Sequence, residues 1–228
     1  MKYFLISSSK DPASRTMRDY LLKYESFNQS RLIPYYSVYP RNNDKESFEK
    51  DQDFKIMYKI IKSSKYENID LIVFDGELVS LTDLDRLFSE KCLLIFLSKH
   101  ASNSKIPTLT SHFTGNFSNN NSLGGKPFEL GVTYPTFQKE YMKNLTDMKE
   151  DLHYYDLVIE ATHHGPTSSS NPLIFVEIGS TEKEWENRLI ASSVCKCILQ
   201  TIVEIDTNVA KDKSKIAIGI GGNHYPQK

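Results

Sequence analysis

The chain has 228 residues, of which 39% are hydrophobic, 25% charged and 11% aromatic. This ordinary globular composition excludes an intrinsically disordered, collagen-like or low-complexity protein, and the length allows one large domain or two small ones. Lys and Arg number 28 against 29 Asp and Glu, so the net charge of -1 disfavours a protein coated in basic charge for non-specific nucleic-acid binding.

Charge is spread unevenly along the chain. Residues 1–50 carry 9 basic and 6 acidic side chains, whereas residues 151–200 carry 3 basic and 7 acidic ones. A solvated surface of mixed charge is the simplest interpretation of this asymmetry. If a polyanion binds, the first fifty residues offer the better candidates for phosphate contacts, namely Lys2, Lys10, Arg15, Arg18, Lys23, Arg31 and Arg41.

The first half of the chain alternates strand-like and helix-like segments. Strands are expected at 3–7, 69–74 and 93–97, an extended segment at 31–39, and helices after the turn at 9–14, over 54–61 and over 81–88. The first helix would be capped by Ser9 or Asp11 and would carry Pro12 at an early position. The buried strands are continuous apolar runs, which is typical of parallel strands covered on both faces.

The second half begins with a stretch of different composition. Pro, Gly, Asn and Ser dominate residues 101–138, so a domain change near residue 105 is expected. Strands follow at 157–159, 173–178 and 216–220, and a long helix lies between the last two. A capping box of Thr181 and Glu184 starts that helix, and an apolar stripe that runs to Val203 includes Cys195 but not Cys197.

These elements predict an α/β fold with a mixed, mostly parallel sheet flanked by helices. Two subdomains are expected: a Rossmann-like α/β unit over 1–105, and a second α/β unit over 106–228 that carries most of the site. No apolar run reaches the length of a membrane helix, and the apolar start at 3–6 is too short for a signal peptide. An odd number of cysteines without a CxxC pair disfavours a disulfide framework and a zinc ribbon, so we expect a cytoplasmic protein without membrane contact.

Three apolar strands run directly into polar loops. Glu160 stands at the end of the first, Glu177 lies within the second, and the third leads into Asn223 and His224. If the strands are parallel, these side chains meet at one rim of the sheet, together with the adjacent pair His163 and His164. A buried carboxylate is costly unless it is paired or ligated, although a glutamate facing solvent at a strand edge remains the alternative.

Histidines mark further positions of interest. His163 and His164 would point to opposite sides of an extended segment unless the following Gly165-Pro166 turn re-aims them. His100 and His112 each share a strand face with hydroxyl residues, which for His112 include Thr110, whereas His153 is expected to be structural. Imidazoles with a carboxylate suit Zn²⁺, and without metal a histidine could act as general base on water.

Other mechanisms have weaker support in the sequence. No GxSxG segment is present and no cysteine lies near a candidate histidine, so a covalent serine or thiol mechanism is disfavoured. The glycines from Gly219 to Gly222 fall short of a dinucleotide fingerprint, and they suggest a close approach of the backbone to a ligand.

Five segments in this order resemble the archaeal and plant type of D-aminoacyl-tRNA deacylase: SKHAS (98–102), LTSHFTGN (109–116), EATHHGP (160–166), FVEIGSTEKEW (175–185) and GIGGNHYP (219–226). The resemblance implies hydrolysis of the ester between a D-amino acid and the terminal ribose of tRNA. It also implies a zinc-dependent monomer with a phosphorylase or peptidyl-tRNA hydrolase-like fold. The chain departs from the family pattern at Lys99, where arginine is common, and over 113–116.

Roles follow as expectations from the cluster and the resemblance together. Catalysis is expected from His163, His164, Glu160 and Glu177. Metal ligation is expected from His112, His163, His164, His224 and Glu177. Contacts with substrate are expected from His100, Thr110, Asn116, Gly221, Gly222 and Asn223.

Two alternatives remain open: a metal-dependent hydrolase of small amides or nucleosides, and a tRNA-binding module without catalysis. The family usually continues beyond the segment that matches 219–226, and this chain ends at Lys228. Any site residue supplied by a longer tail would be missing from it.

Overall fold

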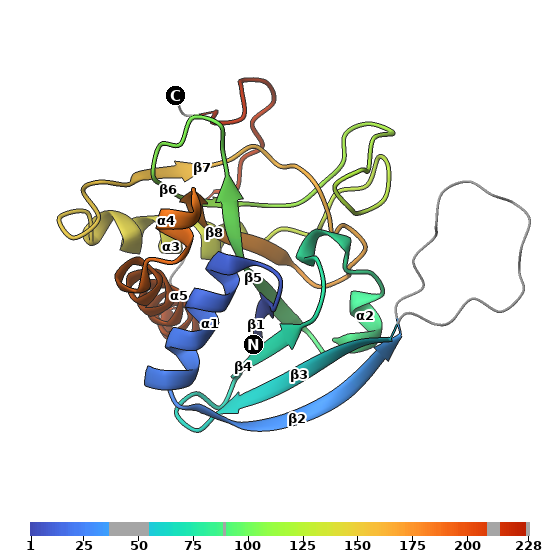
Figure 1. Cartoon of the computed structure of the whole chain (residues 1–228). Coiled ribbons are helices and arrows are strands. Elements are labelled where there is room, and N and C mark those ends of the chain that lie inside the picture. The colour runs from blue at the N-terminus through green and yellow to red at the C-terminus, as the bar shows by residue number, and fades with distance from the viewer. Residues whose placement is uncertain (37–54, 89, 209–214, 227–228) are drawn as a thin grey trace, which may run out of the picture.

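The fold is seen in a computed structural model that describes residues 1–36, 55–88, 90–208 and 215–226. Strands and helices alternate through most of the chain (Figure 1). In order they are β1 (Lys2–Ser8), α1 (Pro12–Tyr24), β2 (Phe27–Tyr36), β3 (Lys55–Ser63), β4 (Ile69–Phe74), the 3-10 turn η1 (Leu78–Ser80), α2 (Leu84–Leu87), β5 (Cys92–Ala101), β6 (Thr108–His112), α3 (Pro135–Asp147), β7 (Asp156–Ile159), β8 (Leu173–Ser180), α4 (Glu182–Trp185) and α5 (Arg188–Asn208).

One eight-stranded sheet organises the molecule, with strand order β2-β3-β4-β1-β5-β8-β6-β7. The pairs β1–β4, β1–β5, β5–β8 and β6–β7 are parallel, whereas β2–β3, β3–β4 and β6–β8 are antiparallel. The predicted α/β class with a mixed sheet is therefore confirmed. Strands from both sides of residue 105 belong to this sheet, and the division into two subdomains stays a prediction.

Helices α1, α3 and α5 cover one face of the sheet. Their buried side chains, such as Met17, Tyr141 and Ile198, form one core with Leu97 and Val176 of the central strands. Strand residues that point the other way, such as Phe96 and Phe175, form a second core with η1 and α2. Alternation along each strand thus supplies a core on both faces, as the continuous apolar runs predicted.

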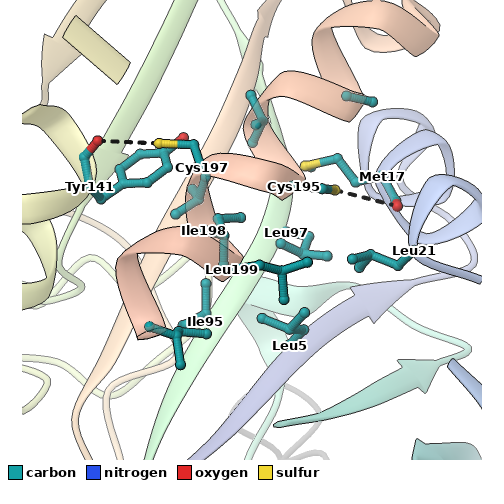
Figure 2. Packing of buried hydrophobic residues seen from close by; sticks show 14 of the residues in the cluster. Leu5, Met17, Leu21, Ile95, Leu97, Tyr141, Cys195, Cys197, Ile198 and Leu199 are labelled. Atoms are coloured by element: carbon teal, nitrogen blue, oxygen red, sulfur yellow. Dashed lines mark hydrogen bonds between the residues drawn. The ribbon is translucent and has the colours of Figure 1, made fainter. Parts of the chain in front are cut away.

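Helix α5 is buried along two flanks (Figure 2). Cys195 faces α1, where its sulfur lies 3.5 Å from the carbonyl oxygen of Met17, and Cys197 faces α3, where its sulfur lies 3.5 Å from that of Tyr141. The expectation that Cys197 lies off the apolar stripe is wrong, because α3 covers this second flank. All three cysteines are buried and free.

Local signals identified the start of α1 correctly but not the strand β3. Asp11 caps α1 and accepts a hydrogen bond from the backbone N–H of Ser14 at 2.8 Å, with Pro12 in the first turn. The helix expected over 54–61 is instead β3, between β2 and β4, and Phe54 lies outside the described residues. Because Tyr58 packs into one core and Ile61 into the other, apolar residues on both faces of the strand imitate helical spacing.

Two further expectations are wrong near the C-terminus. The single helix expected from Thr181 to Val203 is two helices, because the Asn187 carboxamide accepts hydrogen bonds from Leu189 and Ile190 and starts α5 anew. Residues 216–220, expected to be an apolar strand, have no strand partner among the described residues, and Ile218 is 89% exposed. Among the described helices, none combines the length and the apolar character needed to cross a bilayer.

Candidate active site

Strand register places five polar side chains on one face of the sheet. Glu177 of β8 lies beside Ser98 of β5 and opposite Thr110 of β6. His100 comes two residues after Ser98 and His112 two residues after Thr110, so both histidines point to the same face as those neighbours. Because β6 runs antiparallel to β8, the groups lie along the face of β8 and its two neighbours, and the expectation of a single rim of parallel strand ends is wrong in this respect.

The loop after β7 brings three more groups to this face. Glu160 follows β7 directly, and its side chain is fully buried, whereas the rings of His163 and His164 are partly buried. Both rings lie against His112, with centroid distances of 4.1 and 4.7 Å. Of the two arrangements left open for the adjacent histidines, the structure has the one in which they do not face opposite sides: His164 has a left-handed φ of 45°, and its ring centroid lies 4.4 Å from that of His163.

Three of the imidazoles are held in one tautomer by the backbone. Each places Nδ1 within hydrogen-bond distance of a carbonyl oxygen, which only accepts, so Nδ1 carries the proton and donates it. The bare nitrogen of each neutral ring is then Nε2. The bonds are His112 to Phe113 at 3.0 Å, His163 to Ala161 at 2.8 Å and His164 to Gly165 at 2.6 Å.

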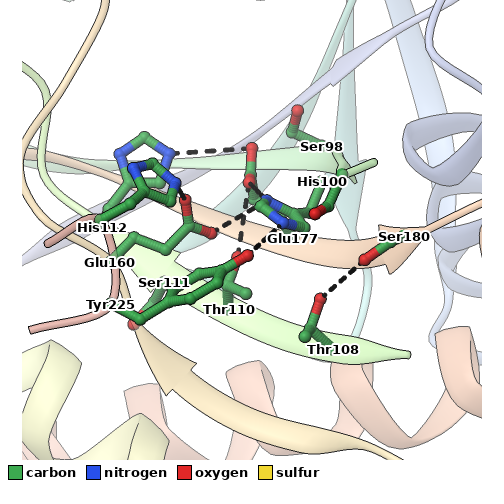
Figure 3. Close-up of polar contacts among 12 residues, drawn as sticks. Ser98, His100, Thr108, Thr110, Ser111, His112, Glu160, Glu177, Ser180 and Tyr225 are labelled. Atoms are coloured by element: carbon green, nitrogen blue, oxygen red, sulfur yellow. Dashed lines mark hydrogen bonds and ion pairs between the residues drawn. The ribbon is translucent and has the colours of Figure 1, made fainter. Parts of the chain in front are cut away.

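His100 lies between two carboxylates. Its Nδ1 is 3.1 Å from Glu160 Oε1 and 3.5 Å from Glu177 Oε2, and its Nε2 is 2.8 Å from the hydroxyl oxygen of Tyr225 (Figure 3). Burial opposes a charge on this ring, but the two carboxylates outweigh it and raise the pKa of His100 to about 10. His100 is therefore a cation at neutral pH that holds the two acidic groups together.

Burial separates the protonation behaviour of the other histidines. Burial and the nearby charge of His112 lower the pKa of His163 to about 4 and that of His164 to about 3. Glu177 outweighs burial at His112 and raises its pKa. Burial alone would raise the pKa of both glutamates, but the imidazoles around them lower the pKa of Glu160 and of Glu177. The site thus combines ionised carboxylates with two imidazoles, His163 and His164, that stay neutral.

The donor set fits a metal ion. One ligand atom from each of His112, His163 and His164 lies within 4.8 Å of the others. A second such group, Glu160 with His163 and His224, shares His163 with the first, and a third, His100 with Glu160 and Glu177, shares Glu160 with the second. Buried His112 Nε2 and both carboxylate oxygens of Glu160 have no hydrogen bond of acceptable geometry. Histidine ligands whose second nitrogen donates to a backbone carbonyl are the usual arrangement around zinc.

Of the remaining residues with an expected role, some contact the cluster and others bond elsewhere or lie exposed. Thr110 donates to Glu177 Oε2 at 3.4 Å, and His224 Nε2 lies 2.6 Å from Glu160 Oε2. The Asn116 amide instead bonds carbonyl oxygens of its own loop, and the Asn223 oxygen accepts from the backbone of Tyr225. Gly221 and Gly222 are exposed, and nothing approaches a Cβ built on Gly221. Substrate contacts by these residues stay predictions.

Three residues of the site were not identified from the sequence. Tyr225 follows His224 in its motif and contacts His100. Trp185, the only tryptophan, donates its ring N–H to the carbonyl oxygen of His100 at 2.9 Å, and Asp11 accepts from the backbone N–H of Lys99 at 3.0 Å. That the only tryptophan lies at the end of the segment 175–185 was the one signal in the sequence that pointed to these supporting contacts.

Four of the basic side chains of the first fifty residues have partners within the protein. Lys2 pairs with Asp70 at 3.0 Å and Arg18 with its neighbour Asp19 at 2.7 Å. Arg15 donates to a backbone carbonyl, and the Lys23 amine lies over the ring of Tyr24. The structure therefore gives no support for a phosphate-binding surface built from these four cations, and Arg41 lies outside the described residues.

Comparisons with known proteins point to one family. A family model described as D-aminoacyl-tRNA deacylase matches residues 88–228. Among curated proteins, the D-aminoacyl-tRNA deacylase of Cenarchaeum symbiosum (strain A) is 37% identical over 161 residues, which are 71% of this chain and 60% of that protein. The one from Methanococcus maripaludis (strain S2) is 33% identical over 232 residues, with 100% of this chain and 73% of that protein covered.

A solved structure has the same fold. It is the crystal structure of a conserved protein of unknown function, with a TM-score of 0.73 and 26% sequence identity, and the match covers 99% of this chain and 70% of that one. This chain therefore spans about 60 to 73% of the length of the two curated relatives and of the solved structure.

Proposed function

The chain belongs to the D-aminoacyl-tRNA deacylase family, and from this premise we propose that it hydrolyses the ester between a D-amino acid and the terminal ribose of tRNA. The observation that carries the proposal is the cluster of His100, His112, His163, His164, Glu160 and Glu177 on one face of the sheet. Ester hydrolysis needs a water nucleophile, a group that takes its proton and a group that stabilises the developing oxyanion, and this cluster offers side chains for the last two roles.

We further propose that His112, His163 and His164 hold a zinc ion through Nε2. Three imidazoles, each neutral when it is bound to the metal, with an open fourth position are a typical catalytic donor set for zinc. A zinc ion bound there would act as a Lewis acid toward the ester carbonyl. His224 and Glu177 remain further candidate ligands, since Glu177 Oε1 lies 3.8 Å from His112 Nε2.

Glu160 is our candidate for the general base. Its lowered pKa keeps it ionised at neutral pH, and its oxygens accept no well-aligned hydrogen bond from the protein. Glu160 would take a proton from water as the water oxygen bonds to the carbonyl carbon. When the ester C–O bond breaks, the ribose oxygen would leave with that proton, which releases the D-amino acid and the tRNA.

His100 and Tyr225 would position these groups. The imidazolium of His100 pairs with both Glu160 and Glu177, so it fixes the distance between the base and the imidazole cluster. With Nδ1 directed at the carboxylates, the Nε2–H can donate to the Tyr225 hydroxyl oxygen. We also propose that the chain acts as a cytoplasmic monomer, in line with its three free cysteines.

The test compares the cleavage of matched D- and L-tyrosyl-tRNA by four proteins. The wild-type chain should cleave the D-ester in preference to the L-ester. His163→Ala and His164→Ala should each lower kcat for the D-ester by at least about a hundredfold, in the range found when a group that acts in the transition state is removed.

His153→Ala is the matched control, because this exposed histidine bonds only its own loop and should leave the rate unchanged. Circular dichroism and thermal melting would verify that each variant folds. Full activity in both His163→Ala and His164→Ala would contradict the proposed site.

A further inference from the structure

Beyond the hydrolytic cluster, the segment from Thr114 to Val132 combines a rigid backbone with exposed apolar side chains. Phe117, Leu123, Phe128 and Leu130 are 69, 61, 72 and 56% exposed. Singly exposed apolar residues are common, but four within one short segment, two of them aromatic, indicate a binding surface. In Figure 1 this segment is the yellow-green loop that projects beyond the sheet at the upper right.

The loop is held by many hydrogen bonds, so its exposed rings are not the result of a loose chain. Gly115 and Leu130 form an antiparallel bridge, and the backbone N–H of Phe128 donates to the carbonyl of Ser118 at 3.1 Å. Asn116 turns inward and donates to the carbonyl oxygens of Gly124 and Lys126. The rings of Phe117 and Phe128 are thus carried by neighbouring backbone segments.

A second set of bonds anchors the loop on the polypeptide that follows the catalytic histidines. The Glu129 carboxylate accepts hydrogen bonds from Thr167 at 2.5 Å and from Ser168 at 2.7 Å. Phe128 adopts a left-handed φ of 54°, which is unfavourable for a bulky residue. The left-handed backbone of Phe128 and the hydrogen bonds of the neighbouring Glu129 together hold the Phe128 ring in water, although burial would be favourable for an aromatic ring.

The same loop is continuous with the candidate active site. Gly115 N–H donates to the carbonyl oxygen of His164 at 2.8 Å, and Gly165 N–H donates to that of Leu123 at 3.0 Å. A Cβ built on Gly115 would meet both Leu130 and Thr162, so Leu130 lies beside the segment that carries the two histidines. A ligand that covers Leu130 therefore lies beside the segment that carries His163 and His164.

We propose that Phe117 and Phe128 form a stacking platform for the unpaired nucleotides at the 3′ end of tRNA. The proposal rests on the proposed function, because the ester to be cleaved is carried by the last of those nucleotides. Exposed aromatic rings on a rigid frame are the usual means of binding single-stranded nucleic acid without reading its sequence. The amine of Lys126, 68% exposed at its side chain and paired with Glu129 at 3.7 Å, is a cation on the same loop for the phosphate backbone.

The experiment measures binding of two fluorescently labelled uncharged tRNAs by anisotropy. One has an intact 3′ end and the other lacks its last three nucleotides. The full-length chain should bind the intact tRNA at least about tenfold more tightly than the trimmed one, and the Phe117→Ala/Phe128→Ala double variant should lose that difference. Phe117→Tyr/Phe128→Tyr should keep it, whereas Phe117→Leu/Phe128→Leu, which retains apolar surface without a ring, should lose most of it.

Tyr154→Ala is the matched control, since this side chain is another exposed aromatic, 77% exposed, on the loop between α3 and β7. It should bind both tRNAs like the wild type. Equal binding of the two tRNAs by the wild type would overturn the platform, even if D-tyrosyl-tRNA is cleaved. The platform is also overturned if the Phe117→Ala/Phe128→Ala variant is a monomer where the wild type is a dimer and binds the two tRNAs like the wild type. A Phe-dependent preference for the intact tRNA with no ester cleavage would uphold the platform and reject the proposed function.

Discussion

Gly179 leaves the space that the ring of His100 occupies. The two residues are register partners on β8 and β5, and a Cβ built on Gly179 would lie 2.7 Å from the Cβ of His100 and 2.8 Å from its Cδ2. Backbone atoms of His100 are equally close, so the added methyl group could not be accommodated by a rotamer change alone. The position of His100 between its two carboxylates depends on this glycine.

Gly179→Ala should therefore displace His100 and lower kcat for the D-ester by about tenfold to a hundredfold, since small displacements of positioning groups have effects of this size. Overpacking of the buried strand pair should also cost about 1–3 kcal/mol in the free energy of unfolding. Enzyme kinetics and urea denaturation measure the two effects. Gly219→Ala is the control, because a Cβ at Gly219 meets nothing and both quantities should stay as in the wild type. Unchanged kinetics in Gly179→Ala would show that the position of His100 does not matter.

Residue types and order were enough to identify the members of the cluster, because a histidine or glutamate beside a buried apolar run is unusual. They were not enough to orient those members. Whether His163 and His164 act together depends on the left-handed φ of His164, which no side-chain pattern encodes. The glycines Gly221 and Gly222 signalled a close approach of backbone, yet they lie exposed in the structure.

Among the secondary-structure elements, α1 and β5 are joined by one buried carboxylate. Asp11 Oδ1 accepts from Ser14 N–H and caps α1, while Oδ2 accepts from Lys99 N–H of β5, next to His100. Burial is the main reason that the pKa of Asp11 is raised. The carboxylate has two acceptor oxygens, one for each of these backbone donors, and Oδ2 also accepts from the Ser98 hydroxyl at 3.3 Å, whereas an asparagine would offer only one acceptor oxygen.

Asp11→Asn should keep the helix cap and lose the link to β5, because the new amide N–H₂ would face the Lys99 N–H. We expect a loss of about 1–3 kcal/mol in the free energy of unfolding, the range for a buried donor left without a partner. Thermal and urea unfolding measure it. Asp19→Asn on the exposed face of α1 is the control and should change stability by less than about 0.5 kcal/mol. Equal effects of the two changes would mean that the link to β5 contributes nothing.

Elements with a local signature were predictable, and those defined by their neighbours were not. The cap of α1 and the capping box of α4 depend on contacts within four residues, and both are present. Strand β3 was mistaken for a helix because its apolar residues serve two cores, which only the sheet reveals. Residues 216–220 alternate like a strand, but no described strand lies beside them to pair with.

At the scale of the whole molecule, the substrate is much larger than the histidine cluster. With a net charge of -1 the chain has little long-range attraction for tRNA, so affinity would come from local phosphate contacts. Such contacts release counterions, whereas contacts with a small ester or amide do not. Salt dependence therefore separates a deacylase that uses the tRNA body from a hydrolase of small molecules.

We expect KM for D-tyrosyl-tRNA to rise by at least about tenfold between roughly 50 and 200 mM salt, as several phosphate contacts are weakened. KM for D-tyrosine ethyl ester should change by less than about twofold over the same range, because it offers no phosphates. Initial-rate kinetics at each salt concentration provide both values. Parallel, shallow dependences for the two substrates would favour a hydrolase of small esters or amides.

The α/β class followed from alternating apolar runs, which depend only on the chain itself. The order of the strands did not, because β6 lies between β7 and β8 and runs antiparallel to β8, a pairing that its own residues do not indicate. Because of this pairing, Thr110 lies directly across from Glu177 and His112 lies on the same face, instead of at the carboxyl end of a parallel strand. The site could therefore be listed from the sequence but could be located only in the structure.

The three imidazoles of His112, His163 and His164, each with Nδ1 bound to a carbonyl, are the most specific feature of this protein. The most direct measurement is calorimetric titration of the metal-stripped chain with zinc. Wild type and His153→Ala should bind zinc alike, and His112→Ala should bind it at least about tenfold more weakly, since even the outer partners of a metal ligand contribute that much. No zinc uptake by the wild type, or equal uptake by His112→Ala, would contradict a metal site at this cluster.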